Sequence, residues 1–169
     1  MFKNLLQTFD FLKTFFFTEV MLLGGYRIAK SAYLFVNSTY LFSKSRNLWT
    51  LFYPKASSIR YGHGSLTIKN ECYVFGGTMN KNVDKYKHET NKFVTLNLMD
   101  KERSFFGYSS FEKKSFIIAG GYYGQKITNA CFIYNVTSNT FEQKGSLNAK
   151  KNKFSFSKLQ GCNLRNRWF

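Results

Sequence analysis

Residues that commonly carry catalysis are scarce in this sequence of 169 residues. It contains two histidines, His63 and His88, and nine acidic residues, with no obvious acid–base pair among them. Ser109 and Ser110 lack the G-x-S-x-G elbow of serine hydrolases. The glycines of residues 120–124 lack the spacing of a phosphate-binding loop. The sequence therefore predicts a protein that is not an enzyme and that uses no cofactor or metal.

Cysteine and proline are also rare. The three cysteines, Cys72, Cys131 and Cys162, match no CxxC spacing, which predicts free, mostly buried thiols in a reducing compartment. We therefore expect a cytoplasmic protein. One proline, Pro54, and twelve glycines mark no long flexible linker.

The sequence has no long apolar run. Residues 1–17 are rich in Leu and Phe, but Asp10 and Lys13 interrupt them, and no stretch reaches the ~18 apolar residues of a membrane span. This segment favours a strand or a truncated helix that leads into the repeats described below. A weak signal peptide is the alternative.

Aromatic and basic residues are abundant instead. Aromatic residues make up 20% of the chain and favour strands, because they suit pleated, half-buried surfaces. Lys and Arg number 25 against 9 Asp and Glu, which gives a net charge of +16 and suggests binding to nucleic acid or an anionic membrane. The cations are mostly lysines spread along the whole chain, so a general surface bias is favoured, and a functional anion patch is the alternative.

An internal repeat is the strongest feature. An apolar run ends in two glycines three times, at Gly24–Gly25, Gly76–Gly77 and Gly120–Gly121. Two aromatic residues, separated by a turn that contains Asn, come later in each unit. They are Tyr86 and Phe93 in the second unit and Tyr134 and Phe141 in the third, with Trp49 in register in a looser first unit. A basic residue then ends each unit: Arg60, Arg103 and Lys151.

This order, at a period of about 50 residues, resembles the kelch repeat. The segment Thr18–Tyr26 is similar to the start of the propeller in BTB-kelch proteins, although no BTB or BACK domain precedes it in this sequence. The resemblance implies an all-β fold: a partial kelch-type β-propeller of about three four-stranded antiparallel blades plus the start of another. The expected organisation is a lead-in at 1–19, repeats at about 20–60, 61–103 and 104–151, a partial repeat at 152–160 and a tail at 161–169.

The middle unit shows how a blade is expected to form. Its four strands are predicted at Gly64–Ile68, Cys72–Phe75, Val83–Lys87 and Lys92–Asn97, with a tight turn at His88–Asn91 in which Asn91 adopts a left-handed conformation. The glycine pair suits a crowded inner edge, where a side chain would collide. The aromatic residues are expected to fill the wedge between adjacent twisted sheets.

The resemblance implies a non-enzymatic protein–protein interaction module. In BTB-kelch proteins the propeller holds substrates of cullin-based ubiquitin ligases or contacts actin. Candidate partner-binding residues are Arg60 and Arg103, at the recurring basic position, and Tyr122 and Tyr123, which follow the third glycine pair. A basic protein that binds nucleic acid or an anionic surface is the alternative, although nucleic acid is the less favoured partner.

Three blades form an open arc whose two end faces are uncovered. We therefore expect a fragment of a longer chain, an oligomer that closes the ring, or a marginally stable product.

Overall fold

The computed structural model describes the backbone of residues 12–16, 19–24, 26–29, 32–35, 38–52 and 59–154. Every regular element in these ranges is a β-strand, which confirms the predicted all-β class. In this part of the chain, no helix is long and apolar enough to cross a membrane. Gly25, the tail at 161–169 and most of the partial repeat at 152–160 lie outside the described residues.

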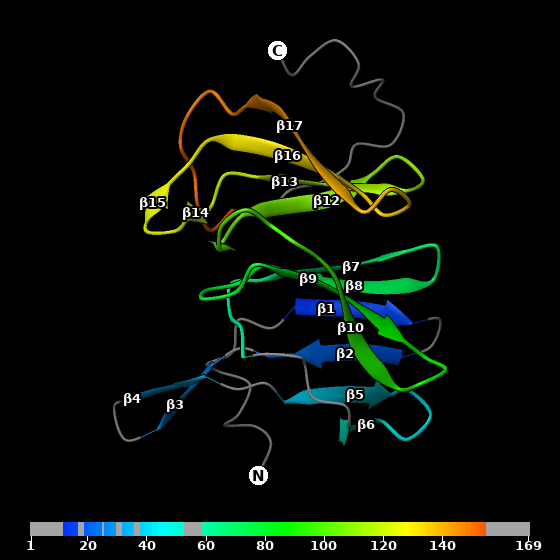
Figure 1. Cartoon of the computed structure of the whole chain (residues 1–169). Coiled ribbons are helices and arrows are strands. Elements are labelled where there is room, and N and C mark those ends of the chain that lie inside the picture. Colours follow the sequence, from blue (N-terminus) through cyan, green and yellow to red (C-terminus); the bar gives the residue numbers. More distant parts are fainter. Residues whose placement is uncertain are drawn as a thin grey trace.

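Three antiparallel sheets of four strands make up the body of the molecule (Figure 1). Sheet 1 contains, in spatial order, β1 (Leu12–Phe16), β2 (Glu19–Leu23), β5 (Thr39–Ser43) and β6 (Leu48–Phe52). Sheet 2 contains β7 (Gly64–Ile68), β8 (Glu71–Phe75), β9 (Asn82–Lys87) and β10 (Lys92–Leu98). Sheet 3 contains β12 (Gly107–Phe111), β13 (Ser115–Ala119), β16 (Ala130–Asn135) and β17 (Thr140–Ser146).

Smaller elements follow the glycine pairs. A hairpin of β3 (Tyr26–Ala29) and β4 (Ala32–Phe35) comes after the first pair. After the third pair, β14 (Tyr122–Tyr123) and β15 (Lys126–Ile127) form a hairpin that pairs with β11 (Arg103–Ser104). The second pair is followed only by a short turn at residues 78–79. Both hairpins project from the same side of the molecule, at the left of Figure 1.

The strand boundaries agree with the expectation from the repeat to within one residue in sheet 2. The turn between β9 and β10 also has the predicted form, because Asn91 has a φ of 53°. Asn47 and Asn139 take the same conformation in the other two sheets, with φ values of 50° and 58°. In sheet 1, β1 lies inside the expected lead-in. The described residues 12–16 of the lead-in are therefore a strand rather than a truncated helix, and they supply the first strand of that sheet.

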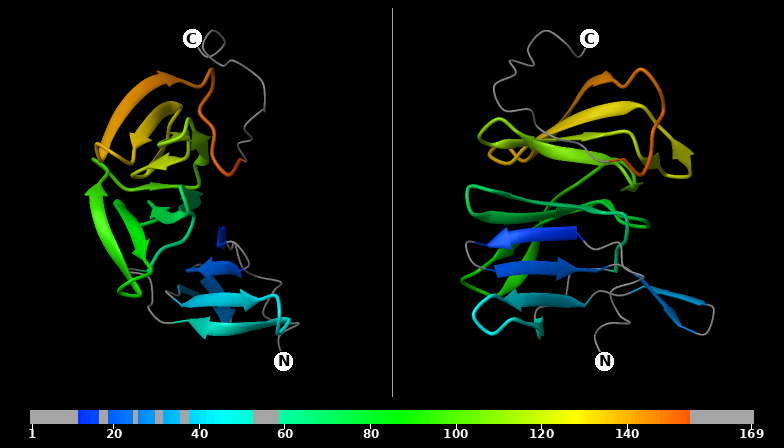
Figure 2. Two further views of the ribbon diagram at one scale, coloured as in Figure 1. Left: turned by 90° about the vertical axis from the view of Figure 1, so that its right-hand side faces the viewer. Right: turned by 180° about the vertical axis from the view of Figure 1, so that it is seen from behind.

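The three sheets fan along an arc (Figure 2). Their first strands are neighbours, since β7 contacts both β1 and β12, and they form the shared inner edge. One buried cluster lies between sheets 1 and 2 and includes Met21, Cys72, Val74 and Tyr86. A larger cluster lies between sheets 2 and 3 and includes Tyr73, Phe75, Val83, Met99, Phe106, Phe116, Ile118 and Tyr134. Each sheet therefore buries its apolar face against the next.

Candidate functional site

Each glycine pair follows the second strand of its sheet. At that point the segment that leads out of the same sheet passes close to the backbone of the pair. A Cβ on Gly76 would lie 2.6 Å from the carbonyl oxygen of Arg103, and a Cβ on Gly120 would lie 2.6 Å from that of Lys151. Both glycines have positive φ, at 64° and 61°. The amide of Gly121 donates to the same Lys151 carbonyl at 2.6 Å. Only glycine allows this approach, so the pairs hold the connecting segments against the sheets.

Arg60 connects sheet 1 to sheet 2. Its carbonyl oxygen is 2.8 Å from the position that a Cβ on Gly24 would occupy. Its guanidinium reaches sheet 2, where Nη1 donates to the carbonyl of Gly76 at 3.4 Å and Nη2 forms an ion pair with Asp84. The two side chains are 0% and 1% exposed. Burial lowers the pKa of Arg60, and the charge and hydrogen bond of Asp84 oppose that effect.

Arg103 makes the corresponding connection from sheet 2 to sheet 3. Its Nη1 donates to the carbonyls of Gly120 at 3.1 Å and Ala130 at 3.2 Å. Phe132 takes the place that Asp84 has in sheet 2, and the guanidinium lies 4.7 Å from its ring centre. This contact is a cation–π interaction in place of an ion pair.

The burial of these arginines corrects one expectation. Arg60 is 0% exposed and Arg103 is 3% exposed, so neither guanidinium reaches the surface where a partner would bind. Both side chains instead connect successive sheets.

Three residues, each two positions after the basic residue that ends a unit, form a row outside the sheets. Gly62, Phe105 and Lys153 all have positive φ, at 62°, 53° and 51°. The amide of Phe105 donates to the carbonyl of Gly62 at 2.7 Å, and the amide of Lys153 donates to the carbonyl of Phe105 at 2.8 Å. Glycine adopts this conformation without strain, whereas a bulky phenylalanine at positive φ is an outlier. The two hydrogen bonds hold Phe105 in this conformation.

Phe105 is the centre of what we call the aromatic–lysine surface, which comprises Tyr61, Lys101, Phe105, Tyr122, Tyr123 and Lys153. The ring of Phe105 meets that of Tyr61 edge-on at 5.6 Å and that of Tyr122 at 6.2 Å. The ammonium of Lys153 lies 5.1 Å above the Phe105 ring. The four aromatic rings are half-buried and the two lysines are exposed.

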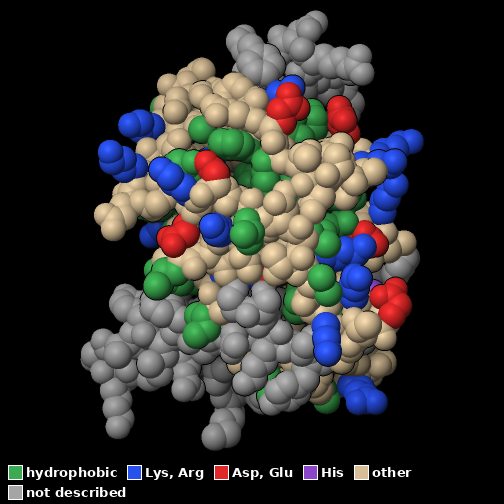
Figure 3. Space-filling model, viewed as in Figure 1, with side chains coloured by type: hydrophobic (Ala, Val, Ile, Leu, Met, Phe, Trp, Pro, Cys, Tyr) green, Lys and Arg blue, Asp and Glu red, His purple; other side chains and the backbone are tan. Residues whose placement is uncertain are grey.

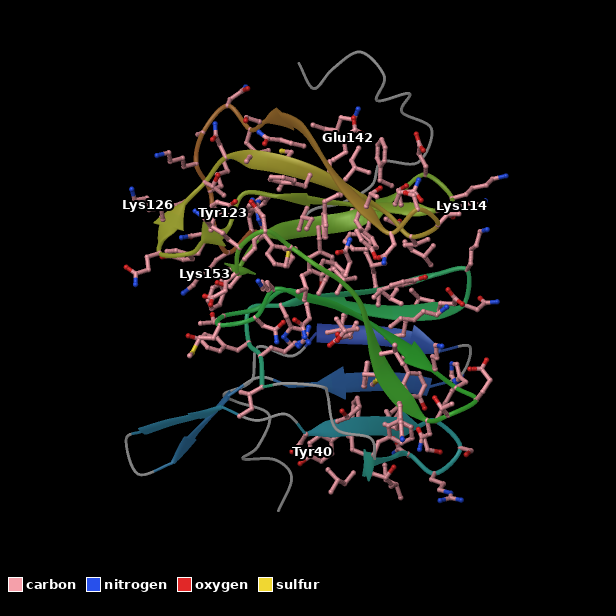
Figure 4. The ribbon with its side chains drawn as sticks, in the orientation of Figure 1. Tyr40, Lys114, Tyr123, Lys126, Glu142 and Lys153 are labelled. Carbon is pink, nitrogen blue, oxygen red and sulfur yellow. The ribbon has the colours of Figure 1, made fainter. Side chains whose placement is uncertain are left out.

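Tyr123 extends this surface along the β14–β15 hairpin. Lys101 lies 5.3 Å and Arg103 5.0 Å from the centre of its ring, and its hydroxyl donates to Asp100. This hydrogen bond, together with burial, raises the pKa of Tyr123. Tyr123, Lys126 and Lys153 lie on the same side of the molecule (Figure 4). Basic side chains also line the opposite side, so the surface is distinguished by its aromatic rings rather than by charge alone (Figure 3).

The sequence predicted Tyr122 and Tyr123 as surface binding residues, and the structure places both in this surface. It did not predict Tyr61, Lys101, Phe105 or Lys153. Their signal lies in the repeat frame, because Phe105 follows Arg103 by two residues as Gly62 follows Arg60. An aromatic residue at the position that glycine occupies in the preceding unit would have identified the centre of the surface.

The predicted aromatic landmarks form cross-strand pairs at one equivalent place in each sheet. The ring centres are 5.3 Å apart for Tyr86 and Phe93 and 4.7 Å apart for Tyr134 and Phe141. Trp49 pairs with Phe42 at 5.1 Å. In the second and third sheets these pairs face the preceding sheet and fill the wedge, since Tyr86 is 5% and Tyr134 0% exposed.

No three His, Cys, Asp or Glu side chains come close enough to hold a metal ion among the residues that the structure describes. Cys72 and Cys131 are both buried, and burial raises the pKa of Cys131. The third cysteine, Cys162, lies outside the described residues.

Comparison with known proteins supports the propeller architecture. Residues 59–97 match the family model of the Kelch motif. The fold is similar to that of the kelch propeller in "Structure of YjhT", with a TM-score of 0.74 and 11% sequence identity over 85% of this chain. This chain spans only 53% of that chain's length. A sequence search of curated proteins finds no match. The chain is therefore a stretch of kelch-type β-propeller.

Proposed function

We propose that this chain is a non-enzymatic protein-recognition module, acting in the cytoplasm, and that it binds its partner with the aromatic–lysine surface. The observation that carries the proposal is the conformation of Phe105. A phenylalanine with a φ of 53° is strained where the preceding unit uses glycine. Strain of this kind, of order 1–3 kcal/mol, persists where surrounding structure holds it, and it clusters at functional sites.

The chemistry of the surface suits a protein partner. Half-buried aromatic rings supply a large contact area and lose little conformational entropy on binding, so they are enriched in protein interfaces. Exposed Lys101 and Lys153 at its border would favour a partner segment that carries acidic side chains. The surface is built on hydrogen-bonded connections between rigid sheets, which limits the ordering that binding requires.

Two finer functions follow from the resemblance to BTB-kelch proteins. The partner would be a substrate presented to a cullin-based ubiquitin ligase, or it would be actin. In the first case these residues would supply only the recognition step, because the link to the ligase runs through a BTB domain.

Binding to nucleic acid or an anionic surface is the alternative, and the net charge of +16 favours it. The same rings would stack on unpaired bases, and the lysines would contact phosphates. The two functions differ in their response to salt, since phosphate contacts release counterions and weaken steeply as salt rises.

The test is affinity capture from untreated lysate of the cells that make this protein, at low salt and at about 0.5 M salt, where exposed charges are screened. Immobilised wild type is compared with Phe105→Gly, which removes the ring and suits the backbone. The matched control is Leu98→Ser, which changes a residue that is 49% exposed on β10.

We expect a protein that wild type and the control retain at high salt and that Phe105→Gly loses. Capture of nucleic acid alone, lost as salt rises, would replace this proposal with the alternative. A protein retained equally by all three chains would exclude the aromatic–lysine surface as its binding site.

A further inference from the structure

Sheet 1 has an apolar face that points away from sheet 2. In the register of β5 and β6, Phe42 is opposite Trp49 and Tyr40 is opposite Leu51. Neighbouring side chains on a strand point to opposite faces, and Leu41 packs in the cluster with sheet 2. These four residues therefore share the far face, and Tyr40 is seen on that side in Figure 4. Leu51 is 48% exposed.

The same position is an inter-sheet contact elsewhere in the molecule. The pair that corresponds to Phe42 and Trp49 is Tyr86 and Phe93 in sheet 2, and it packs against sheet 1. Tyr86 lies 6.0 Å from the ring of Phe52 in sheet 1. The far face of sheet 1 thus has the composition of a face that receives a preceding sheet.

Sheet 3 presents the opposite kind of face. Ile117 and Ile133 are register partners in β13 and β16, at the places that Tyr73 and Lys85 hold in sheet 2. Tyr73 is 2% exposed, because it packs in the cluster between sheets 2 and 3. Ile117 and Ile133 are only half-buried. Their face corresponds to one that a following sheet covers.

Lys151 completes this second face. Its carbonyl accepts a hydrogen bond from Gly121, just as the Arg103 carbonyl accepts one from Gly77. From the equivalent positions, Arg60 and Arg103 extend forward to a glycine carbonyl of the next sheet. The side chain of Lys151 is exposed, and it places a positive charge at the edge of sheet 3 that corresponds to the position of the two arginines.

We propose that these two faces bind each other between two copies of the chain, so that sheet 3 of each copy covers sheet 1 of the other. Two arcs of three sheets would then close a ring of six, and closed propellers have about four to eight blades. The Lys151 ammonium would donate to the carbonyl of Gly24 in the second copy. This inference stands independently of the proposed partner-binding surface.

The test is the molar mass in solution, measured by sedimentation equilibrium over about a hundredfold range of concentration. Wild type should have twice the chain mass of 19.8 kDa. Leu51→Asp and Ile133→Asp each place a charge in one of the two faces and should weaken dimerisation at least about 100-fold, because burying an unpaired charge is costly. Leu98→Asp is the matched control, since Leu98 is 49% and Leu51 48% exposed.

A mixture of the two face variants distinguishes head-to-tail pairing from other modes. Neither variant alone should dimerise, but an equimolar mixture should form mixed dimers, because one unaltered pair of faces is then available. Circular dichroism establishes that each variant remains folded. A wild-type mass of one chain at all concentrations would overturn the proposal. Polymers that grow with concentration, or dimers that only one of the two variants abolishes, would overturn it as well.

Discussion

Replacement of Arg60 by methionine should destabilise the protein more than the equivalent replacement of Arg103. Arg60→Met removes the guanidinium from Asp84, whose carboxylate is 1% exposed and also accepts a hydrogen bond from Thr95 at 2.7 Å. Breaking a buried ion pair in this way costs about 3–5 kcal/mol. Arg103 has no carboxylate in the corresponding place. Its replacement removes hydrogen bonds to two carbonyls and cation–π contacts with the rings of Phe132 and Tyr123, but it takes no partner away from a buried carboxylate.

The assay is urea unfolding followed by far-ultraviolet circular dichroism, at one protein concentration for all variants. Arg60→Met should lower the free energy of unfolding by about 1 kcal/mol or more beyond the effect of Arg103→Met, because only Arg60→Met removes the partner of a buried carboxylate. Adding Asp84→Leu to Arg60→Met should recover at least half of the loss, because both buried charges are then gone. Equal losses for the two arginines, or a further loss on adding Asp84→Leu, would refute the reasoning.

Two further predictions concern the glycine pairs and a buried tyrosine. Gly120 and Gly124 both have a φ of 61°, but a Cβ would lie 2.6 Å from the Lys151 carbonyl at Gly120 and would meet nothing within 4 Å at Gly124. In thermal unfolding, Gly124→Ala should cost only the backbone strain of about 1–2 kcal/mol, and Gly120→Ala should cost clearly more; equal costs would contradict the steric argument. Burial raises the pKa of Tyr134 to about 12, whereas an unfolded tyrosine ionises near 10, so unfolding releases its proton and stability should fall between about pH 10 and pH 12. Tyr134→Phe should make this fall shallower in urea unfolding at a series of pH values, and an unchanged pH profile would contradict the assignment.

The sequence was sufficient for the repeat and for the strands it encodes. Glycine pairs after apolar runs predict sharp strand ends, and Asn91 predicts a left-handed turn. Both signals depend on local backbone conformation, so a single unit contains what is needed to interpret them. For that reason the strands of sheet 2 could be placed within one residue.

The roles of the arginines could not be predicted in the same way. Arg60 and Arg103 look like exposed basic residues in a polar stretch, and they were predicted to contact a partner. Asp84, which forms the ion pair with Arg60, lies in the unit that follows Arg60. In the unit that follows Arg103, Phe132 occupies the equivalent position, and its ring contacts the guanidinium. Burial that depends on contacts between units is not visible in the pattern of one unit.

The aromatic–lysine surface escaped prediction for a related reason. Phe105 departs from the repeat, because it occupies a position at which Gly62 satisfies the backbone. A comparison of the units detects residues that recur. Phe105 does not recur at this position in the other units, so such a comparison overlooks it. Local inconsistencies of this kind are expected at functional sites.

The central claim is that hydrogen-bonded connections hold the three sheets and the aromatic–lysine surface together as one rigid body. Amide hydrogen exchange tests this claim most directly. The amides of Phe105, Gly121 and Lys153 lie outside the strands, yet each donates to a carbonyl of another segment at 2.6–2.8 Å. They should exchange as slowly as the amide of Ile118 in the centre of sheet 3. Exchange as fast as that of Glu89, in the exposed turn of sheet 2, would contradict the account.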